Sequence, residues 1–258
     1  MKLVIQLYYI QKFFFVWFGD DVYMKPCTLL IHNHIKKITL KLKGGSETVV
    51  TIMLTGGSSA ESLYKLWSSD LTFNHSNIIY YFGDERCVLP NHPDSNYGMA
   101  VSTLFPNGIP QNCKVERMRG EENNFHIEAM RYSNLLPESV DILLFSVGPD
   151  GHIASLFPYG DKLNEMNRAV VPVTGSKLPS ERLTITQKII KSAKHIIVIA
   201  NGETKGKALT RALEDPNNIQ EMPVRLTIGT SWFLDESAMN TFNLLNKNDL
   251  HNTRIFSA

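Results

Sequence analysis

Four short runs of apolar residues constrain the fold of this chain more than any other feature of its sequence. They are continuous, without the polar alternation of a strand that has one face in water. Both faces of such strands must be covered, which is typical of a parallel sheet, because crossover connections place helices on both of its faces. The runs are TVVTIML (48–54), NIIYYF (77–82), DILLFSV (141–147) and HIIVIA (195–200).

The segments between these runs include predicted helices. Residues 58–67 (SSAESLYKLW) begin with two serines that suit a helix cap, and residues 203–215 repeat apolar residues at helical spacing until Pro216 ends them. Residues 105–125 and 158–181 are predicted to be extended loops. Because no internal repeat or long linker is found, the sequence predicts one α/β domain with a mostly parallel sheet.

Composition supports a single globular domain over residues 1–258 and excludes several classes of protein. Hydrophobic residues make up 43% of the chain, and 26 Lys and Arg against 25 Asp and Glu give a net charge of +1. This balance lacks the basic excess of a nucleic-acid-binding protein. The three cysteines, Cys27, Cys87 and Cys113, suggest neither a disulfide framework nor a zinc site, so we expect a reducing, cytoplasmic compartment.

The N-terminal residues 1–21 are rich in aromatic side chains, as a signal sequence or membrane anchor can be. Gln6, Gln11 and Lys12 interrupt the apolar run, which is shorter than the roughly 20 residues that span a bilayer. No small-residue cleavage site follows it. We therefore predict a buried strand and helix of the domain here, and no membrane partner.

Each of the four predicted strands is followed by residues suited to binding or catalysis. In open parallel sheets, ligands bind outside the carboxyl ends of the strands, where loops and helix N-termini meet. Glycines, hydroxyls, acids, cations and one histidine therefore converge at one edge of the sheet. The segments are Thr55–Ala60, Gly83–Arg86, Gly148–His152 and Asn201–Lys207.

The first of these segments, TGGSS, is suited to an anion. Gly56 and Gly57 let backbone amides approach a ligand closely. Ser58 stands at a predicted helix start, where free N–H groups and the helix dipole favour a phosphate. The alternative is an ordinary turn with a serine cap. Neither of the common glycine-rich nucleotide motifs is present here.

The second segment supplies Arg86, whose planar guanidinium suits a phosphate or a carboxylate. Asp84 and Glu85 beside it leave open the alternative of a structural ion pair. The loop that follows ends at Asp94 or Ser95, and we expect Asp94 to cap the next helix.

His152 is the strongest candidate for proton transfer. An imidazole changes its charge near neutral pH, and Asp150 is close enough in sequence to orient it. A lone histidine is more often structural, but the flanking Gly148 and Gly151 and the position at a strand end favour a functional site. No H-x-x-x-H or H-E-x-x-H spacing indicates a metal site.

Two further cations lie next to predicted elements. Arg182 begins the β-like run RLTIT (182–186), and Lys205 lies in the first turn of a predicted helix. The helix dipole disfavours a cation there, and a bound anion would explain it. The alternative is a solvated lysine, which costs only about a few tenths of a kcal/mol.

Taken together and in this order, five motifs resemble those of the 6-phosphogluconolactonase family, within the superfamily that also contains glucosamine-6-phosphate isomerases. They are TGGSS, FGDER with the following DSN, GPDGHIASLFP, RLTIT and GETKGKAL, and they span about residues 46–230. The G-x-D-G-H-x-A-S-L-F-P element is highly specific. The resemblance implies a modified Rossmann-like sheet and hydrolysis of 6-phospho-D-glucono-1,5-lactone in the oxidative pentose phosphate pathway, without metal or organic cofactor.

From the residues and the resemblance together, we expect specific roles. His152 activates water, Asp150 orients the imidazole or the sugar, and Arg86 lies near the substrate. The residues expected to hold the 6-phosphate are Gly56, Gly57, Ser58, Arg182 and Lys205. The binding partner is then a sugar-phosphate lactone. Some family members are also fused to glucose-6-phosphate dehydrogenase, so this chain is a candidate for such a fusion or association.

The chain departs from the family pattern at several positions, and its first 45 residues match poorly. The departures are Thr55, Ser59–Ala60, Phe82 and Ser146, where serine, Thr-Pro, tryptophan and glycine are common. Two alternatives stay open. Glucosamine-6-phosphate deaminase shares D-G-H-I-A but continues F-N-E-P, whereas residues 155–158 here lack the acid. A regulatory module would bind the sugar phosphate without turnover.

Overall fold

The four apolar runs lie next to one another in the main sheet, in the order β9-β6-β2-β3. The structure is a computed structural model that describes residues 6–8, 27–44, 48–242 and 254–256. The four strands are β2 (Val50–Leu54), β3 (Ile78–Phe82), β6 (Ile142–Ser146) and β9 (His195–Ala200). All of them pair in parallel. The prediction of a mostly parallel α/β sheet is confirmed.

Four shorter strands complete an eight-stranded sheet in the order β11-β1-β10-β9-β6-β2-β3-β5. They are β1 (Gln6–Tyr8), β5 (Cys113–Val115), β10 (Ser231–Leu234) and β11 (Arg254–Phe256). The prediction of an extended loop over 105–125 was wrong at β5, because three residues with one buried side chain give no readable pattern. Of the strand and helix predicted over residues 1–21, residues 1–5 and 9–21 lie outside the described residues.

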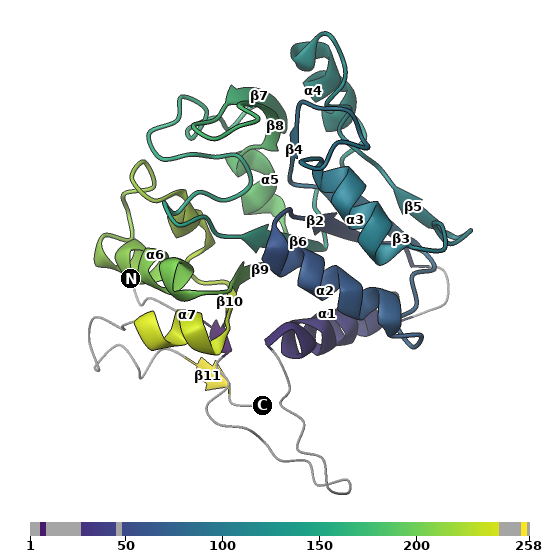
Figure 1. Cartoon of the computed structure of the whole chain (residues 1–258), viewed down its shortest axis with the longest axis horizontal. Helices are drawn as coiled ribbons and strands as arrows, with labels where there is room; N and C mark the ends of the chain where they lie inside the picture. The colour runs from purple at the N-terminus through teal and green to yellow at the C-terminus, as the bar shows by residue number, and fades with distance from the viewer. Residues whose placement is uncertain (1–5, 9–26, 45–47, 243–253, 257–258) are drawn as a thin grey trace, which may run out of the picture.

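Helices cover both faces of the sheet (Figure 1). One face packs on α1 (Cys27–Lys43), α2 (Ser58–Ser69) and α3 (Asn96–Leu104). The other packs on α4 (Phe125–Ser133), α5 (Gln187–Ser192), α6 (Glu203–Glu214) and α7 (Glu236–Thr241). Within β6, Ile142 and Leu144 face the first layer, whereas Leu143 and Phe145 face the second. The apolar runs are continuous because successive side chains enter different cores.

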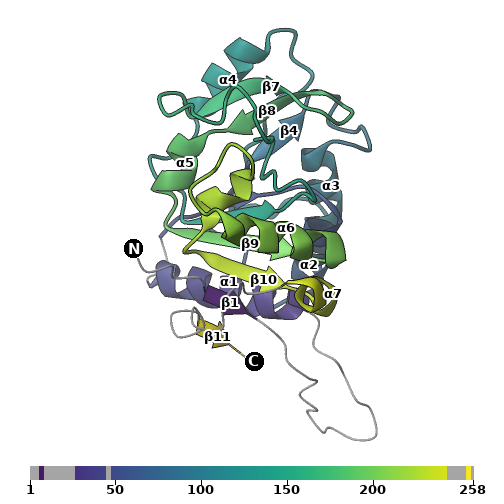
Figure 2. The ribbon, with the colours of Figure 1, turned by 90° about the vertical axis from the view of Figure 1, so that its left-hand side faces the viewer.

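A second, antiparallel sheet lies beside the carboxyl edge of the first, in the order β4-β8-β7 (Figure 2). Its strands are β4 (Asp84–Arg86), β7 (Val170–Thr174) and β8 (Glu181–Ile185). Arg86 is therefore on a strand and not in a loop. The predicted loop over 158–181 was wrong at β7, whose Pro172 obscures the pattern and is tolerated because β7 is an edge strand.

Two further observations bear on the class of protein. Among the described residues, no helix combines the length and the apolar character needed to cross a bilayer. Cys87 and Cys113 are free thiols.

The close packing of α6 on α7 makes a first prediction. A Cβ on Gly206 would overlap the Ala238 carbonyl oxygen and Thr241 Oγ1. Alanine is favoured over glycine within a helix by about 1 kcal/mol, but we expect the overlap to win and Gly206→Ala to lower the free energy of unfolding by about 1–3 kcal/mol. Urea denaturation measures the change, and Lys207→Ala on the exposed side of α6 is the control. An equally stable or more stable Gly206→Ala protein would contradict this packing.

Candidate active site

The turn after β6 brings Asp150 and His152 into direct contact. The backbone folds back beyond Ser146, so that the Gly148 N–H donates to the His152 carbonyl oxygen at 2.9 Å. His152 Nδ1 is hydrogen-bonded to Asp150 Oδ1. The side chains are 17% exposed for His152 and 35% exposed for Asp150, so the pair is accessible to a ligand.

Two glycines make this contact possible. A Cβ on Gly148 would overlap the His152 ring and crowd Asp150 Oδ1. Gly151 has a φ of +84°, in the left-handed region that favours glycine, and a Cβ there would overlap Met222. The D-G-H turn therefore needs both glycines for its shape.

The surroundings of Asp150 keep its carboxylate ionised. Burial alone would raise the pKa of Asp150, but the hydrogen bond with His152 and the charges of His152 and Lys177 lower it to about 2. An ionised carboxylate only accepts hydrogen bonds, so in the neutral imidazole the proton lies on Nδ1. The free lone pair is then on Nε2, as a general base requires.

Strand β8 contributes Arg182 to the same region. Its guanidinium carbon lies 5.5 Å from the centre of the Phe157 ring, and that ring lies 4.9 Å from the His152 ring. Arg182 Nε donates to the Pro179 carbonyl oxygen at 3.0 Å, and Nη2 donates to the Lys177 carbonyl oxygen at 3.2 Å. These bonds hold the β7–β8 connection next to the imidazole.

Arg86 does not form a structural ion pair with Asp84 or Glu85, the alternative that the sequence left open. Among the described residues, neither Asp84 nor Glu85 makes a salt bridge with its guanidinium. Arg86 Nη1 donates instead to the Asp94 carbonyl oxygen at 2.9 Å. Arg86 is bonded to the Glu85 carboxylate through its backbone N–H, at 2.8 Å, and not through its guanidinium.

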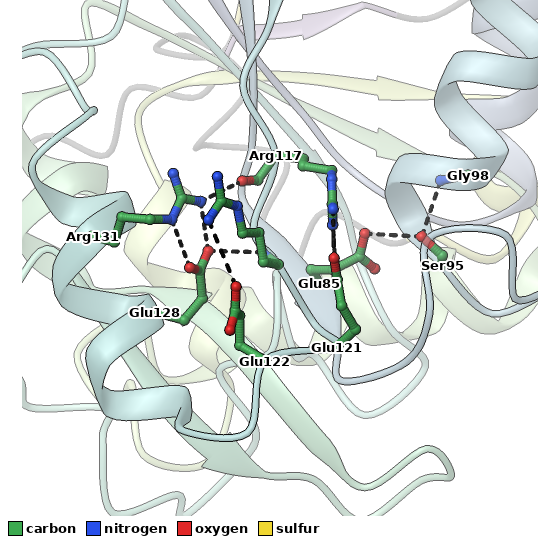
Figure 3. A network of polar contacts seen from close by, with 9 residues as sticks. Glu85, Ser95, Gly98, Arg117, Glu121, Glu122, Glu128 and Arg131 are labelled. Atoms are coloured by element: carbon green, nitrogen blue, oxygen red, sulfur yellow. Dashed lines mark hydrogen bonds and ion pairs between the residues drawn. The ribbon is translucent and has the colours of Figure 1, made fainter.

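Arg86 and Arg182 form a pair of neighbouring cations, and among the described residues neither makes an ion pair. They are opposite each other on β4 and β8. The pKa of Arg182 is lowered by burial and by the charge of Arg86, which the charges of Asp84 and Asp94 only partly offset. Every other arginine whose side chain the structure describes forms an ion pair with a carboxylate, as Figure 3 shows for Arg117 and Arg131. Two neighbouring guanidinium groups without a carboxylate indicate a site for an anion.

Asp84 has a role that the sequence analysis missed. It is buried and accepts hydrogen bonds from Ser155 Oγ at 2.6 Å and from Asn96 Nδ2 at 3.2 Å. The Asn96 amide in turn packs so closely on Gly56 that a Cβ there would overlap it. Asp84 therefore ties together three of the motifs. The position of Asp84 within G-D-E-R, at the end of a strand, was the one sequence signal for a role. The sequence positions of Ser155 and Asn96 did not indicate that they contact it.

Glu85 holds the N-terminus of α3. Its buried carboxylate accepts hydrogen bonds from Ser95 Oγ at 3.1 Å (Figure 3) and from the backbone N–H groups of Asn96 and Tyr97 at 2.7 and 2.8 Å. Burial raises the pKa of Glu85 to about 7. The carboxylate thus fixes the helix that follows the Arg86 strand.

Ser95, and not Asp94, caps α3. Ser95 Oγ accepts a hydrogen bond from the Gly98 N–H at 3.0 Å, as Figure 3 shows. The prediction that Asp94 is the cap was wrong. The physical reason is that Glu85 fixes the Ser95 hydroxyl in the capping position, which a local sequence pattern does not reveal.

The TGGSS turn leaves the start of α2 without a side-chain cap. Gly57 is the N-cap residue at a φ of +94°, and Ser58 and Ser59 lie within the first turn. The predicted serine cap was therefore wrong. The N–H groups of this turn remain suited to an anionic ligand.

Lys205 links this turn to a second uncapped helix. It lies in the first turn of α6, which begins after Gly202 at a φ of +93°. Its Nζ donates to Ser59 Oγ at 3.0 Å and to Ser146 Oγ at 3.2 Å. Burial lowers the pKa of Lys205, and within the described part of the chain no carboxylate forms an ion pair with it.

The predicted site residues fall into two groups at the same edge of the main sheet. Asp150 and His152 form the first, which Arg182 approaches through the Phe157 ring and to which Arg86 is joined as the neighbour of Arg182. Lys205 lies in the second, with the Gly56–Ser58 segment at the start of α2. The described residues contain no group of three His, Cys, Asp or Glu side chains able to hold a metal ion. Chemically, the arrangement places an imidazole in contact with a carboxylate, and cations without an ion pair at the same edge of the sheet.

This chain is similar to known proteins in both sequence and fold. The model of the family described as glucosamine-6-phosphate isomerases/6-phosphogluconolactonase matches residues 28–232. A 6-phosphogluconolactonase of Haemophilus influenzae is 34% identical over 206 residues, covering 74% of this chain and 86% of that protein. The 6-phosphogluconolactonase 3 of Saccharomyces cerevisiae is 33% identical over 225 residues, covering 79% and 88%. A crystal structure of 6-phosphogluconolactonase from Thermotoga maritima shares the fold, with a TM-score of 0.71, 22% identity and coverage of 90% and 98%.

The contact between His152 and Asp150 predicts a measurable change in acidity. His152→Ala is expected to raise the pKa of Asp150 from about 2 towards its ordinary value of about 3.9, because the hydrogen bond and the charge of His152 are lost while the effect of Lys177 remains. The stabilisation from the lowered pKa is fully present above about pH 4 and is lost as the pH falls towards 2. NMR titration of the Asp150 carboxyl carbon measures the shift, with His126→Ala on α4 as control. An unchanged pKa would contradict the contact.

Proposed function

Because this chain belongs to the glucosamine-6-phosphate isomerase/6-phosphogluconolactonase family, we propose that it hydrolyses 6-phospho-D-glucono-1,5-lactone to 6-phosphogluconate. The observation that carries the proposal is the Asp150–His152 pair beside two guanidinium groups without a carboxylate. This lactone has the two groups that such a site suits. Its ester carbonyl is open to attack by base-activated water, and its phosphate matches the cations.

In the proposed reaction, His152 Nε2 takes a proton from water while the water oxygen attacks C1 of the lactone. The carbonyl oxygen becomes the oxyanion of a tetrahedral intermediate. Collapse of this intermediate breaks the bond between C1 and the ring oxygen, which receives the proton back from His152. Asp150 stays ionised and holds the imidazole throughout. The product is an acid, whose carboxyl group then releases one proton.

We assign the charged parts of the substrate to the cations of the site. The 6-phosphate would bind the backbone N–H groups of Gly56, Gly57 and Ser58, together with Arg182 and Lys205. Arg86 would lie near the reacting carbonyl and the product carboxylate. The support is that none of the three cations forms an ion pair with a carboxylate among the described residues. A donor to an oxyanion typically contributes about 3–4 kcal/mol to a transition state.

Deamination of glucosamine 6-phosphate is the alternative within the family. The deaminase pattern has an acid in the segment after D-G-H-I-A, and this chain has none there. Ser155 donates to Asp84, and Phe157 lies against the His152 ring. An aromatic ring therefore lies against the imidazole, and the segment offers no acid, which favours hydrolysis of the lactone.

We further propose that the reaction takes place in the cytoplasm, as part of the oxidative pentose phosphate pathway. The free thiols of Cys87 and Cys113 suit a reducing compartment. A fusion to or association with glucose-6-phosphate dehydrogenase stays a prediction, and co-purification from the source cells would test it.

The purified chain is expected to hydrolyse freshly prepared 6-phosphogluconolactone faster than the spontaneous reaction, which must be subtracted. His152→Ala should lower kcat by about 10²–10⁴-fold, the usual contribution of a positioned base. His126→Ala, which changes an exposed histidine on α4, should leave kcat unchanged.

Other outcomes of this assay identify the alternatives. Release of ammonia from glucosamine 6-phosphate, without lactone hydrolysis, would establish the deaminase. Binding of the sugar phosphate with no turnover of either compound would establish a regulatory module. Wild-type turnover by His152→Ala would remove the role proposed for the imidazole.

Lys205→Ala is expected to act mainly on KM. Binding of a phosphate far from the reacting carbonyl is nearly equal in the ground and transition states, so its loss raises KM and changes kcat little. Steady-state kinetics on the phosphorylated lactone measures both constants. Lys207→Ala, two residues further along α6 and exposed, is the matched control. An unchanged KM in Lys205→Ala would contradict the assignment.

A further inference from the structure

Ser146 contributes a hydroxyl to the region between α2 and α6. It is the last residue of β6, and its backbone N–H donates to Thr55 Oγ1 at 3.2 Å. Its Oγ accepts a hydrogen bond from Lys205 Nζ at 3.2 Å. It also lies 3.7 Å from the point where a Cβ on Gly57 would be. The hydroxyl therefore lies directly beside the glycine turn.

The hydrogen bonds around Lys205 leave donors unused. The ammonium has three protons and donates to Ser59 Oγ and Ser146 Oγ. Both hydroxyls act as acceptors in these bonds, so each keeps its own proton. Among the described residues, neither hydroxyl donates to an acceptor. The same place thus has two hydroxyl protons, one ammonium proton and the N–H groups of an uncapped helix.

Such a set of donors calls for an acceptor with several oxygens. Burial weakens the charged form of Lys205, and the charge of Asp235 only partly offsets this. Asp235 forms no ion pair with Lys205 among the described residues, and its carboxylate accepts instead from the backbone N–H groups of Gly202 and Ala238. A phosphate provides three oxygens that accept hydrogen bonds, and it would compensate the buried ammonium. A neutral sugar hydroxyl would satisfy only part of the set.

We propose that Ser146 is a phosphate-binding and specificity-determining residue, which donates its hydroxyl proton to the substrate phosphate while it holds Lys205 at the start of α2. The inference rests on the phosphate position in the proposed function. It adds a residue that selects the phosphorylated lactone over the same lactone without phosphate. Because the hydroxyl bonds to Lys205 and forms no hydrogen bond with His152 or Asp150 among the described residues, we expect it to affect binding and not the chemical step.

The test compares Ser146→Ala with wild type on two lactones. For 6-phosphogluconolactone, KM should rise about tenfold, the typical size of a lost hydrogen bond to a charged group, and kcat should stay within about twofold. For unphosphorylated glucono-1,5-lactone, KM should not change. Ser69→Ala, at the far end of α2 with its hydroxyl on the Leu66 carbonyl oxygen, is the control. An equal rise in KM for both lactones, or no rise, would overturn the inference.

Binding of inorganic phosphate separates this inference from the proposed reaction. Calorimetry should give a dissociation constant about tenfold higher for Ser146→Ala than for wild type, whether or not the chain hydrolyses a lactone. Ser146→Cys, which keeps the shape but donates weakly, should also lose affinity. Ser146→Ala should cost less in a Lys205→Ala background, because the two groups act together. Equal phosphate affinity in all proteins, or no phosphate binding by wild type, would overturn the inference.

Discussion

The parallel pairing of β6 with β2 and β9 is the constraint on which the site depends. Asp141, at the start of β6, fixes this pairing through Oδ2, which accepts from the Thr51 N–H at 2.8 Å, and through Oδ1, which accepts from Lys194 Nζ at 2.8 Å. A slip of one residue would exchange the side chains of the two cores. The same register fixes where β2, β6 and β9 end relative to one another. It therefore positions the glycine turn, the D-G-H turn and the start of α6, which follow these strands. A polar contact at one edge thus positions the chemistry at the other.

Two physical features characterise the site itself: side chains packed closely against glycines, and neighbouring cations that form no ion pair among the described residues. Gly148 and Gly56 leave room for the His152 ring and the Asn96 amide, which a Cβ would displace. Arg86 and Arg182 lie opposite each other without an ion pair to a carboxylate among the described residues, although such an arrangement is electrostatically unfavourable. An anionic ligand bound between the two guanidinium groups would relieve this repulsion, which would contribute to its binding free energy.

Prediction from the sequence succeeded where a pattern is local and strong. The four central strands, the helices at 58–67 and 203–215, and the strand-end position of His152 were all readable, because burial on both faces and helical spacing leave clear signals. β5 and β7 were missed, since short edge strands carry little apolar pattern. The predicted caps at Asp94 and at the serines of α2 were also wrong. The start of α3 is fixed by the contact of Glu85 with Ser95, and the start of α2 by the backbone conformation of Gly57.

By itself, the sequence determined the class of fold, the edge of the sheet that carries the chemistry and the resemblance that points to a sugar-phosphate lactone. These depend on residue types and on their order, which need no knowledge of distant contacts. Only the tertiary structure decided that Arg86 faces Arg182, that Phe157 lies against His152 and that Ser146 contacts Lys205. The physical reason is that such pairings join residues from separate strands and helices, and their distances are fixed by sheet register and packing rather than by any local pattern.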